Sequence, residues 1–402
     1  MIIEISVENY LSIRERITLS LEAGPSRKKI ENLIKLDNSY YLKSAAIFGP
    51  NASGKSNIIK SIFFIWKMVS SSHKFNVDST IPVIPFKLDN NVSKPSSFEL
   101  IFIYKNIKYK YGFSCTKKEI INEYLYYWPK GRESLIFKRN KSKYTVNKEE
   151  ESKQRPYQKQ TIANTLYLSR ATQLGYEKTK NAYEFIVNNI VVNIHPNWRN
   201  QTIISMYDNP KFKNKILEIM KAVDFGGITD FHMEKHEKKA VGYEINFKKD
   251  EPLVSSLPPK DFIELKFLHN DIEFNFEEES EGTRNALILL GPIFNIIEGE
   301  KVLFIDELDR SLHSNITKFL IKLFHSKNNK KAQILFTTHD TNLLDNDIFR
   351  RDQLYLCTKK PNQNTQLSSF LDYDLRENSD FENYYLNGRV GGLPFIDDTV
   401  LD

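Results

Sequence analysis

The sequence predicts an α/β fold with a mixed, mostly parallel core sheet, an antiparallel β lobe and a helical insert. A glycine-rich loop over 49–56 follows the apolar run 45–48 and precedes a helical pattern, which is the order of strand, turn and helix. Two later stretches, 301–307 and 333–340, are apolar runs that end in polar residues, as buried parallel strands do. A third observation is a series of alternating segments between these features, which indicates antiparallel strands.

The antiparallel lobe is predicted from alternation and from the turns between segments. Residues 3–7 alternate apolar and polar side chains, and 17–21 form their expected hairpin partner. Four further strands are expected at 97–104, 107–115, 120–128 and 135–138. The charged stretch 148–160 has few apolar residues and is predicted to be an exposed loop.

A change from alternating segments to helical spacing of apolar residues predicts the helical insert. A short strand is expected at 165–169, followed by helices at 183–194 and 210–224, while strand character returns at 242–247 and 262–276. The expected division is a first lobe at 1–175, an insert or lid at 176–260 and a second lobe at 261–402.

Residues 49–56 read Gly-Pro-Asn-Ala-Ser-Gly-Lys-Ser, a complete G-x-x-x-x-G-K-[ST] phosphate-binding loop. Two glycines let the backbone curl so that successive N–H groups face an anion, and the following helix adds its unpaired N–H groups. The lysine can reach terminal phosphates and the last serine can hold Mg²⁺. The candidate nucleotide ligands are Gly49, Asn51, Ala52, Ser53, Gly54, Lys55, Ser56 and Asn57.

The two later apolar runs supply candidate catalytic residues. The run 301–305 ends in Asp306 and Glu307, where a phosphate-loop protein places a magnesium ligand and a general base. The run 333–337 is followed by His339, which the order of the motifs makes a candidate γ-phosphate sensor, although a lone histidine at a strand end is usually structural.

The turn Ser280-Glu281-Gly282-Thr283 opens the expected helix 285–297, just before the acidic strand. A helix N-terminus of this kind binds anions, so Ser280, Gly282 and Thr283 are candidate phosphate contacts. A plain N-cap explains the same residues equally well.

The composition of the chain bears on its expected partners and on its expected cellular compartment. A formal charge of +6 permits nucleic-acid contact, and the basic clusters 27–29 and 138–143 are either phosphate or partner contacts or charged hairpin turns. Two cysteines, Cys115 and Cys357, have no metal or disulfide spacing. No signal peptide or membrane span is visible, so we expect a cytoplasmic protein without membrane contact.

These motifs together resemble the ABC-type ATPase heads of the SMC, RecF and OLD kind. The match is nearer still to a bacterial branch labelled AAA, which includes ATPase subunits of anti-phage abortive-infection systems (RloA/AbiL-like and PARIS-like). The resemblance covers most of the chain and is carried by the motifs at 7–13, 49–56, 111–113, 280–283, 306–313, 338–340 and 385–394.

The resemblance implies an ATPase that binds ATP and Mg²⁺ and closes as a dimer or larger oligomer around nucleotide. The turn at Ser280 of one chain would touch the nucleotide on the loop of another, and Gln173 would complete the metal shell, unless it is simply a surface glutamine. A separately encoded effector, such as a nuclease, is the implied partner. A repair ATPase acting directly on nucleic acid and a non-hydrolysing ATP clamp are the alternatives, and Glu307 argues against the clamp.

Overall fold

The computed structural model describes residues 1–88, 90–193, 198–223, 227–238, 243–248, 251–256, 260–310, 312–374 and 380–391. The chain divides into two compact units, each with its own internal contacts. The first comprises Met1–Ile194, Ile296–Arg310 and Thr317–Asp402, and the second His195–Asn295 and Ser311–Ile316. The predicted three-part division of the chain stays a prediction.

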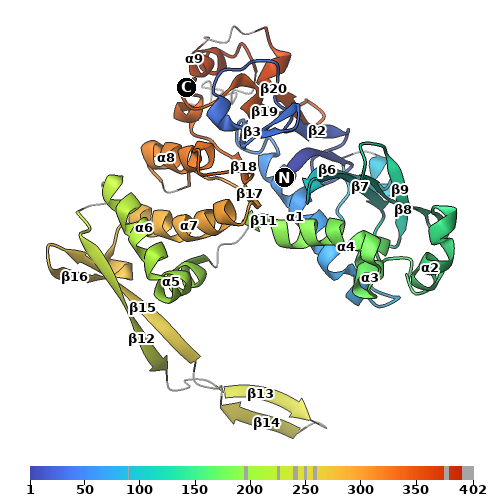
Figure 1. The fold of residues 1–402 in the computed structure, drawn as a ribbon, viewed down its shortest axis with the longest axis horizontal. Helices are drawn as coiled ribbons and strands as arrows, with labels where there is room; N and C mark the ends of the chain where they lie inside the picture. Colours follow the sequence, from blue (N-terminus) through green and yellow to red (C-terminus); the bar gives the residue numbers. More distant parts are fainter. Residues whose placement is uncertain are drawn as a thin grey trace, which may run out of the picture. The chain divides into compact units, whose positions relative to one another are not determined.

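The first unit contains the predicted mixed core sheet (Figure 1). Within the described residues its six strands lie in the order β11-β17-β18-β5-β19-β20. The first five strands pair in parallel and β20 is antiparallel, which confirms the predicted fold class. The bounds are β5 Ser44–Phe48, β11 Ile190–Asn193, β17 Val302–Ile305, β18 Gln333–Thr337, β19 Leu354–Lys359 and β20 Thr365–Ser369.

An antiparallel sheet of seven described strands forms the predicted β lobe of the same unit, in the order β10-β9-β8-β7-β6-β1-β2. The expected hairpin of the N-terminal strands is confirmed, and β1 also pairs with β6, so the hairpin and the later strands form one sheet. Strands β3 and β4 pair antiparallel with each other in a separate two-stranded sheet. The bounds are β1 Ile2–Glu8, β2 Ile17–Ser20, β3 Leu33–Leu36, β4 Ser39–Leu42, β6 Ser96–Tyr104, β7 Ile107–Cys115, β8 Ile120–Trp128, β9 Ser134–Asn140 and β10 Lys143–Thr145.

Helix α1, Lys55–Ser71, carries the phosphate-binding loop at its start and packs between the two sheets of this unit. Its buried face contains Phe64, whose ring lies 4.9 Å from that of Phe98 on β6. The other helices of the unit are α2 Lys148–Lys159, α3 Tyr167–Gln173, α4 Glu177–Glu184, α8 Ser314–His325 (which begins in the second unit) and α9 Phe381–Leu386.

Two expectations for this unit are wrong because distant polar contacts decide the local structure. The predicted loop at 148–160 is helix α2, where buried Gln154 donates 3.0 Å to the Ile136 carbonyl. The predicted strand at 165–169 contains the start of α3 instead. The fully buried carboxylate of Glu123 accepts from the Tyr167 and Leu168 amides at 2.6 and 2.9 Å, which stabilises this helix N-terminus.

The helix expected at 183–194 is also partly wrong. A π-helical turn over Phe185–Asn189 ends it, and β11 follows as a parallel edge strand of the core sheet. The β-branched run Ile190-Val191-Val192 explains the change, because such side chains favour a pleated and buried surface. Residue 194 lies outside the described residues.

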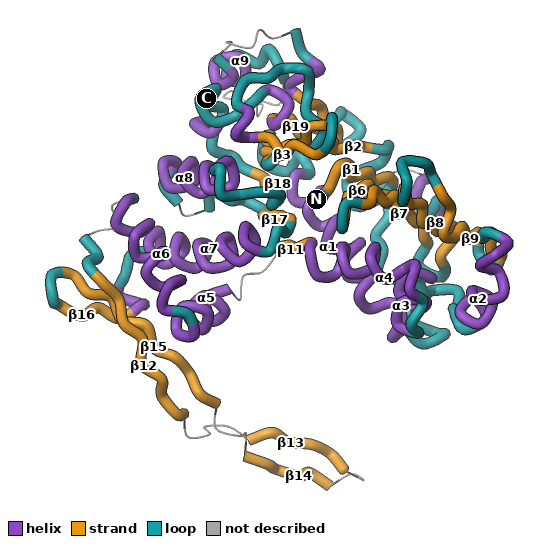
Figure 2. The backbone as a smooth tube through the Cα atoms, viewed as in Figure 1, coloured by secondary structure: helices purple, strands orange, loops and turns teal. Residues whose placement is uncertain are grey.

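The second unit contains the predicted helical insert and a small sheet (Figure 2). Its helices are α5 Trp198–Asp208, α6 Pro210–Ala222 and α7 Glu281–Glu298, whose last turn returns to the first unit. Strands β12 Asp230–Lys238, β15 Lys260–His269 and β16 Ile272–Asn275 form one antiparallel sheet. Strands β13 Tyr243–Lys248 and β14 Glu251–Ser256 pair with each other. The helix predicted at 210–224 is confirmed as α6; Gly242 and Asp224, which the predictions included, lie outside the described residues.

No described helix is both long enough and apolar enough to cross a membrane.

A buried histidine makes the stability of the first unit depend on pH. His325 is 5% exposed, Ser44 Oγ lies 2.9 Å from its Nε2, and Gln353 Nε2 lies 3.3 Å from the same atom. Burial, with the charge of Lys43 nearby, lowers the pKa of His325 to about 3. The folded protein therefore prefers the neutral ring, and this contribution to stability is lost as the pH falls from the unfolded-state pKa of about 6.5 toward 3.

We expect the free energy of unfolding to fall by about 1.4 kcal/mol per pH unit below about pH 6 on account of this residue. Urea unfolding between pH 7.5 and 4.5 measures the slope. The variant His325→Gln keeps an acceptor for Ser44 and should flatten that slope, whereas His313→Gln, which removes an exposed histidine, should not. Identical slopes for His325→Gln and the wild type would contradict the prediction.

Candidate active site

The phosphate-binding loop leaves β5 and enters α1 through left-handed backbone positions. Gly49 has φ +146° and Gly54 has φ +108°. A Cβ atom at Gly49 would collide with the Cys357 carbonyl oxygen, and one at Gly54 with the Thr365 hydroxyl. Both glycines are therefore required by backbone conformation and by close packing.

The loop is held from behind by side chains distant in sequence. Thr365 Oγ1 donates to the Ser53 carbonyl at 2.9 Å and lies 2.7 Å from Ser12 Oγ. Asn57 Nδ2 donates to the same Ser12 oxygen at 2.7 Å. These bonds join the loop to the N-terminal segment and to β20, and sequence reasoning gave no role to Ser12 or Thr365.

Lys55 is 5% exposed, and its ammonium lies inside the loop. Nζ donates to the Gly49 and Pro50 carbonyls at 2.7 and 3.0 Å and lies 3.4 Å from His339 Nδ1. Burial lowers the pKa of Lys55, while nearby acidic groups oppose that shift. The position matches an ammonium that can exchange carbonyl partners for phosphate oxygens.

The structure brings the two predicted magnesium ligands Ser56 and Asp306 together. Ser56 Oγ donates to Asp306 Oδ1 at 3.1 Å, and Thr337 Oγ1 donates to the same carboxylate oxygen at 2.7 Å. Asp306 directly follows β17, whereas Ser56 lies in the first turn of α1. Strands β17 and β5 run parallel on either side of β18, so their carboxyl ends place both oxygen ligands at one edge of the core sheet.

Glu307 and His339 lie next to each other at the same edge. Glu307 Oε1 is 3.8 Å from His339 Nε2, and both side chains are partly exposed. Glu307 has φ +53°, a conformation that non-glycine residues rarely adopt, and its amide donates 2.8 Å to Thr337 Oγ1. The Glu307 carboxylate is thus held close to the histidine at this edge of the sheet.

Asp309 is a further residue of this site that sequence reasoning did not single out. Its Oδ2 accepts from the His339 amide at 3.3 Å. Its Oδ1 is buried and has no hydrogen-bond partner within the described part of the protein. The sequence signal that could have identified Asp309 is its position in the acidic run Asp306-Glu307-Leu308-Asp309.

The residues fit a nucleotide with a divalent metal ion. Ser53 Oγ is buried in the loop and has no hydrogen-bond partner among the described residues, so it can donate to a phosphate. In the described chain no side chain caps the N-terminus of α1, which leaves its amides for an anion. A hydroxyl and a carboxylate oxygen in contact are the donor types that Mg²⁺ prefers.

The predicted turn at Ser280 lies in the second unit. Ser280 Oγ accepts from the Thr283 amide at 3.1 Å and lies 2.8 Å from Thr283 Oγ1. Ser280 is exposed and Thr283 is buried. The plain N-cap interpretation thus describes the hydroxyl in this structure, and the phosphate contacts of Ser280, Gly282 and Thr283 stay predictions.

Gln173 is the last residue of α3 and is exposed. Its side-chain oxygen accepts from Arg170 Nη1 at 3.0 Å, a contact within one helical turn. The interpretation as a surface glutamine accounts for this contact, and the metal role of Gln173 stays a prediction.

The fold and the site define a P-loop nucleotide-binding protein of the ATPase class. Residues 44–345 match the family model AAA_21, described as "AAA domain, putative AbiEii toxin, Type IV TA system". The chain belongs to this family. The matched residues include the loop, Asp306, Glu307 and His339.

Solved structures similar to the chain include SMC head domains. One, the SmcHead bound to the C-winged helix domain of ScpA, has a TM-score of 0.48 at 14% identity, covering 92% of this chain and 97% of that one. The SMC head domain from Thermotoga maritima has a TM-score of 0.40 at 13% identity, and the match covers 92% of this chain and 98% of that one. A third structure is the Smc head domain with an extended coiled coil bound to the C-terminal domain of ScpA, derived from Pyrococcus furiosus. Its TM-score is 0.43 at 13% identity, and the match covers 92% of this chain and 96% of that one. A search of curated proteins finds no match.

Proposed function

We propose that this protein binds Mg-ATP on the loop 49–56 and hydrolyses it. The observation that supports this most is the meeting of five side chains at one edge of the core sheet. Lys55 Nζ is 3.4 Å from His339, Glu307 is 3.8 Å from the same ring, and Ser56 bonds Asp306 at 3.1 Å. Phosphate binding, metal binding and water activation each have a residue there.

Binding begins with the loop and its lysine. The Ser53 hydroxyl and the amides of α1 would hold the phosphates, and Lys55 would replace its carbonyl partners with terminal phosphate oxygens. Ser56 and Asp306 would hold Mg²⁺, which supplies positive charge that neutralises the phosphates when it is bound.

Hydrolysis then requires a base. Glu307 would take a proton from the attacking water as the water oxygen bonds to the γ-phosphorus and ADP leaves with the bridging oxygen. His339 would orient the Glu307 carboxylate and donate toward the γ-phosphate. The Asp309 carboxylate, which accepts from the His339 amide, fixes the backbone position of that histidine.

We propose further that two chains close around nucleotide and that the closed state controls a separately encoded effector in anti-phage defence. Two observations support this proposal. Helix α7 begins at an exposed turn after Ser280, and helix N-termini bind anions, such as a nucleotide held by another chain. The description of the family names a putative toxin of a type IV toxin–antitoxin system, which is a setting of paired proteins.

The second candidate is an SMC- or RecF-like repair ATPase that acts directly on nucleic acid. The hairpin β9–β10 favours it, because Lys138, Lys141 and Lys143 are exposed there. Lys141 pairs with Glu119 at 2.9 Å, which also fits an ordinary charged turn. ATP hydrolysis that DNA accelerates in the wild type and not in a Lys138→Glu, Lys143→Glu variant would favour the repair function.

The proposed ATP site predicts that Lys55→Ala binds ATP at least about tenfold more weakly, a loss of about 1.4 kcal/mol or more. Titration of a fluorescent ATP analogue measures this affinity. Lys60→Ala, on the exposed face of the same helix, is the matched control and should bind like the wild type. Equal affinity of Lys55→Ala and the wild type would remove the loop as the nucleotide site.

A further inference from the structure

One polar face of the sheet β12–β15–β16 in the second unit concentrates carboxylates and histidines. Glu234 on β12 lies directly opposite Glu264 on β15 in the strand register. Like charges directly opposite each other destabilise an antiparallel pair. This face therefore contains a repulsive pair that needs a compensating positive charge.

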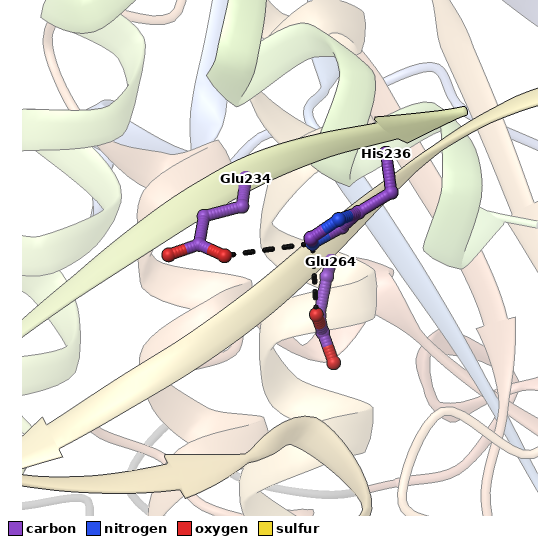
Figure 3. Close-up of side chains that lie close together, drawn as sticks. All are labelled: Glu234, His236 and Glu264. Atoms are coloured by element: carbon purple, nitrogen blue, oxygen red, sulfur yellow. Dashed lines mark ion pairs between the residues drawn. The ribbon is translucent and has the colours of Figure 1, made fainter.

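A histidine lies between the two carboxylates (Figure 3). His236 Nε2 is 3.0 Å from Glu264 Oε2 and 3.5 Å from Glu234 Oε2. One ligand atom from each of the three residues lies within 4.8 Å of the other two. Two of the residues occupy positions i and i+2 of one strand and the third comes from the neighbouring strand, so all three point to the same side of the sheet.

Two lysines near this face form ion pairs with other acids. Lys266 pairs with Glu273 at 3.4 Å, and Lys213 pairs with Asp230 at 3.3 Å. Among the described residues, the ion pairs of Glu234 and Glu264 run to histidines. Glu273 first, and then Glu234 and Glu264, raise the pKa of Lys266, so this lysine divides its charge among three carboxylates. A divalent cation between Glu234 and Glu264 would balance their two charges directly.

We propose that Glu234, His236 and Glu264 bind a divalent transition-metal ion of the Zn²⁺ class. Zn²⁺ takes imidazole nitrogen and carboxylate oxygen at about 2.0–2.2 Å, which puts neighbouring ligand atoms of a tetrahedral site about 3.3 Å apart. The two distances from His236 already match that spacing. The imidazole selects against Mg²⁺ and Ca²⁺, which prefer oxygen ligands.

The surroundings of the cluster fit a site that is open to solvent. The side chains of Glu234, His236 and Glu264 are 49%, 40% and 39% exposed, so an ion can reach them and keep a water ligand. His232 stands beside the cluster and not in it, because its Nε2 lies 3.2 Å from Glu273 Oε1 and 3.9 Å from Glu234 Oε1. The ion would join β12 to β15 independently of the ATP site.

The test uses the full-length protein without an affinity tag, stripped with a chelator and free of nucleotide. Titration calorimetry with Zn²⁺ alone should give one site per chain, and saturating Zn²⁺ should raise the melting temperature by several degrees. Co²⁺ should give the visible absorption of a tetrahedral site. His236→Gln should weaken Zn²⁺ binding by about a hundredfold or more, since even an outer-shell partner is worth about 10–100-fold.

His269→Gln is the matched control, because His269 belongs to β15 but alternates to the opposite face. It should bind Zn²⁺ like the wild type. The double variant Glu234→Gln, Glu264→Gln should lose the ion and yet melt no lower than the metal-free wild type, because the repulsion is gone. Wild-type protein that takes up no Zn²⁺, or a double variant that binds like the wild type, would overturn the proposal. A double variant that melts lower than the metal-free wild type would identify the cluster as a structural ion-pair network instead.

Discussion

Glu307→Gln should bind ATP like the wild type and hydrolyse it at least about a hundredfold more slowly, since a positioned general base contributes about 10²–10⁴-fold. Glutamine keeps the size and the hydrogen-bonding oxygen of glutamate, but its amide does not accept a proton from water. Because Lys55, Ser56 and Asp306 are untouched, the phosphate and metal contacts remain. Phosphate release under saturating Mg-ATP and equilibrium nucleotide binding separate the two effects.

The chain offers a close control for this substitution. Glu300 lies just before β17, at the end of the strand opposite Glu307, and has φ +50° against +53° for Glu307. Glu300→Gln is therefore the same chemical change at a similar backbone conformation, and it should hydrolyse ATP at the wild-type rate. A Glu307→Gln protein as active as Glu300→Gln would remove Glu307 as the base.

The second large effect concerns assembly. In the presence of ATP, the Glu307→Gln protein should accumulate as a dimer, because the closed dimer no longer hydrolyses its nucleotide. Adding Ser280→Arg should abolish that dimer, since a bulky cation would fill the exposed turn proposed to approach the partner's nucleotide. Light scattering with and without Mg-ATP measures both states.

Ser280→Arg removes both a helix cap and the proposed contact with the partner's nucleotide, so controls must separate the two effects. Ser280 accepts from the Thr283 amide, and removing such a cap costs about 1 kcal/mol of stability. Ser280→Asn keeps a capping oxygen with modest added bulk and should retain part of the dimer. Ser142→Arg adds the same cation at an exposed hairpin turn and should leave the dimer intact. An ATP-driven dimer that persists with Ser280→Arg would mean that the chains close through another surface.

The sequence predicted the core sheet, and the motifs that meet at its edge, because those features are local. A loop that requires glycine at two left-handed positions and a short strand followed by acids leave clear patterns at fixed spacing. Each apolar run of the parallel sheet also marks its own end with polar residues. Asp306 and Ser56 could therefore be paired before their 3.1 Å contact was known.

The missed elements depend on partners far away in the chain. Helix α2 has little apolar periodicity, and its buried contacts are polar ones, such as Gln154 with Ile136. The start of α3 is set by the carboxylate of Glu123, more than forty residues earlier. A window of neighbouring residues contains no trace of either contact, so propensity alone assigned both segments to the wrong class.

The functional residues that sequence reasoning passed over have a similar explanation. Thr337 bonds both Asp306 and the Glu307 amide, yet in the sequence it is one more residue of a buried strand. Asp309 becomes visible as a partner of His339 when the two strand ends lie side by side. Such supporting residues are defined by geometry across the sheet and not by a motif.

The bonds behind the phosphate-binding loop bear on how the protein can be divided. The family match begins at residue 44 and ends at 345, whereas Ser12, Cys357 and Thr365, which pack against the loop, all lie outside it. A fragment cut at those limits would also lose β1, β2, β19 and β20, and with them two strands of each large sheet. The segment that the family model matches is thus not an independent module, because its phosphate-binding loop is held by residues before position 44 and after position 345.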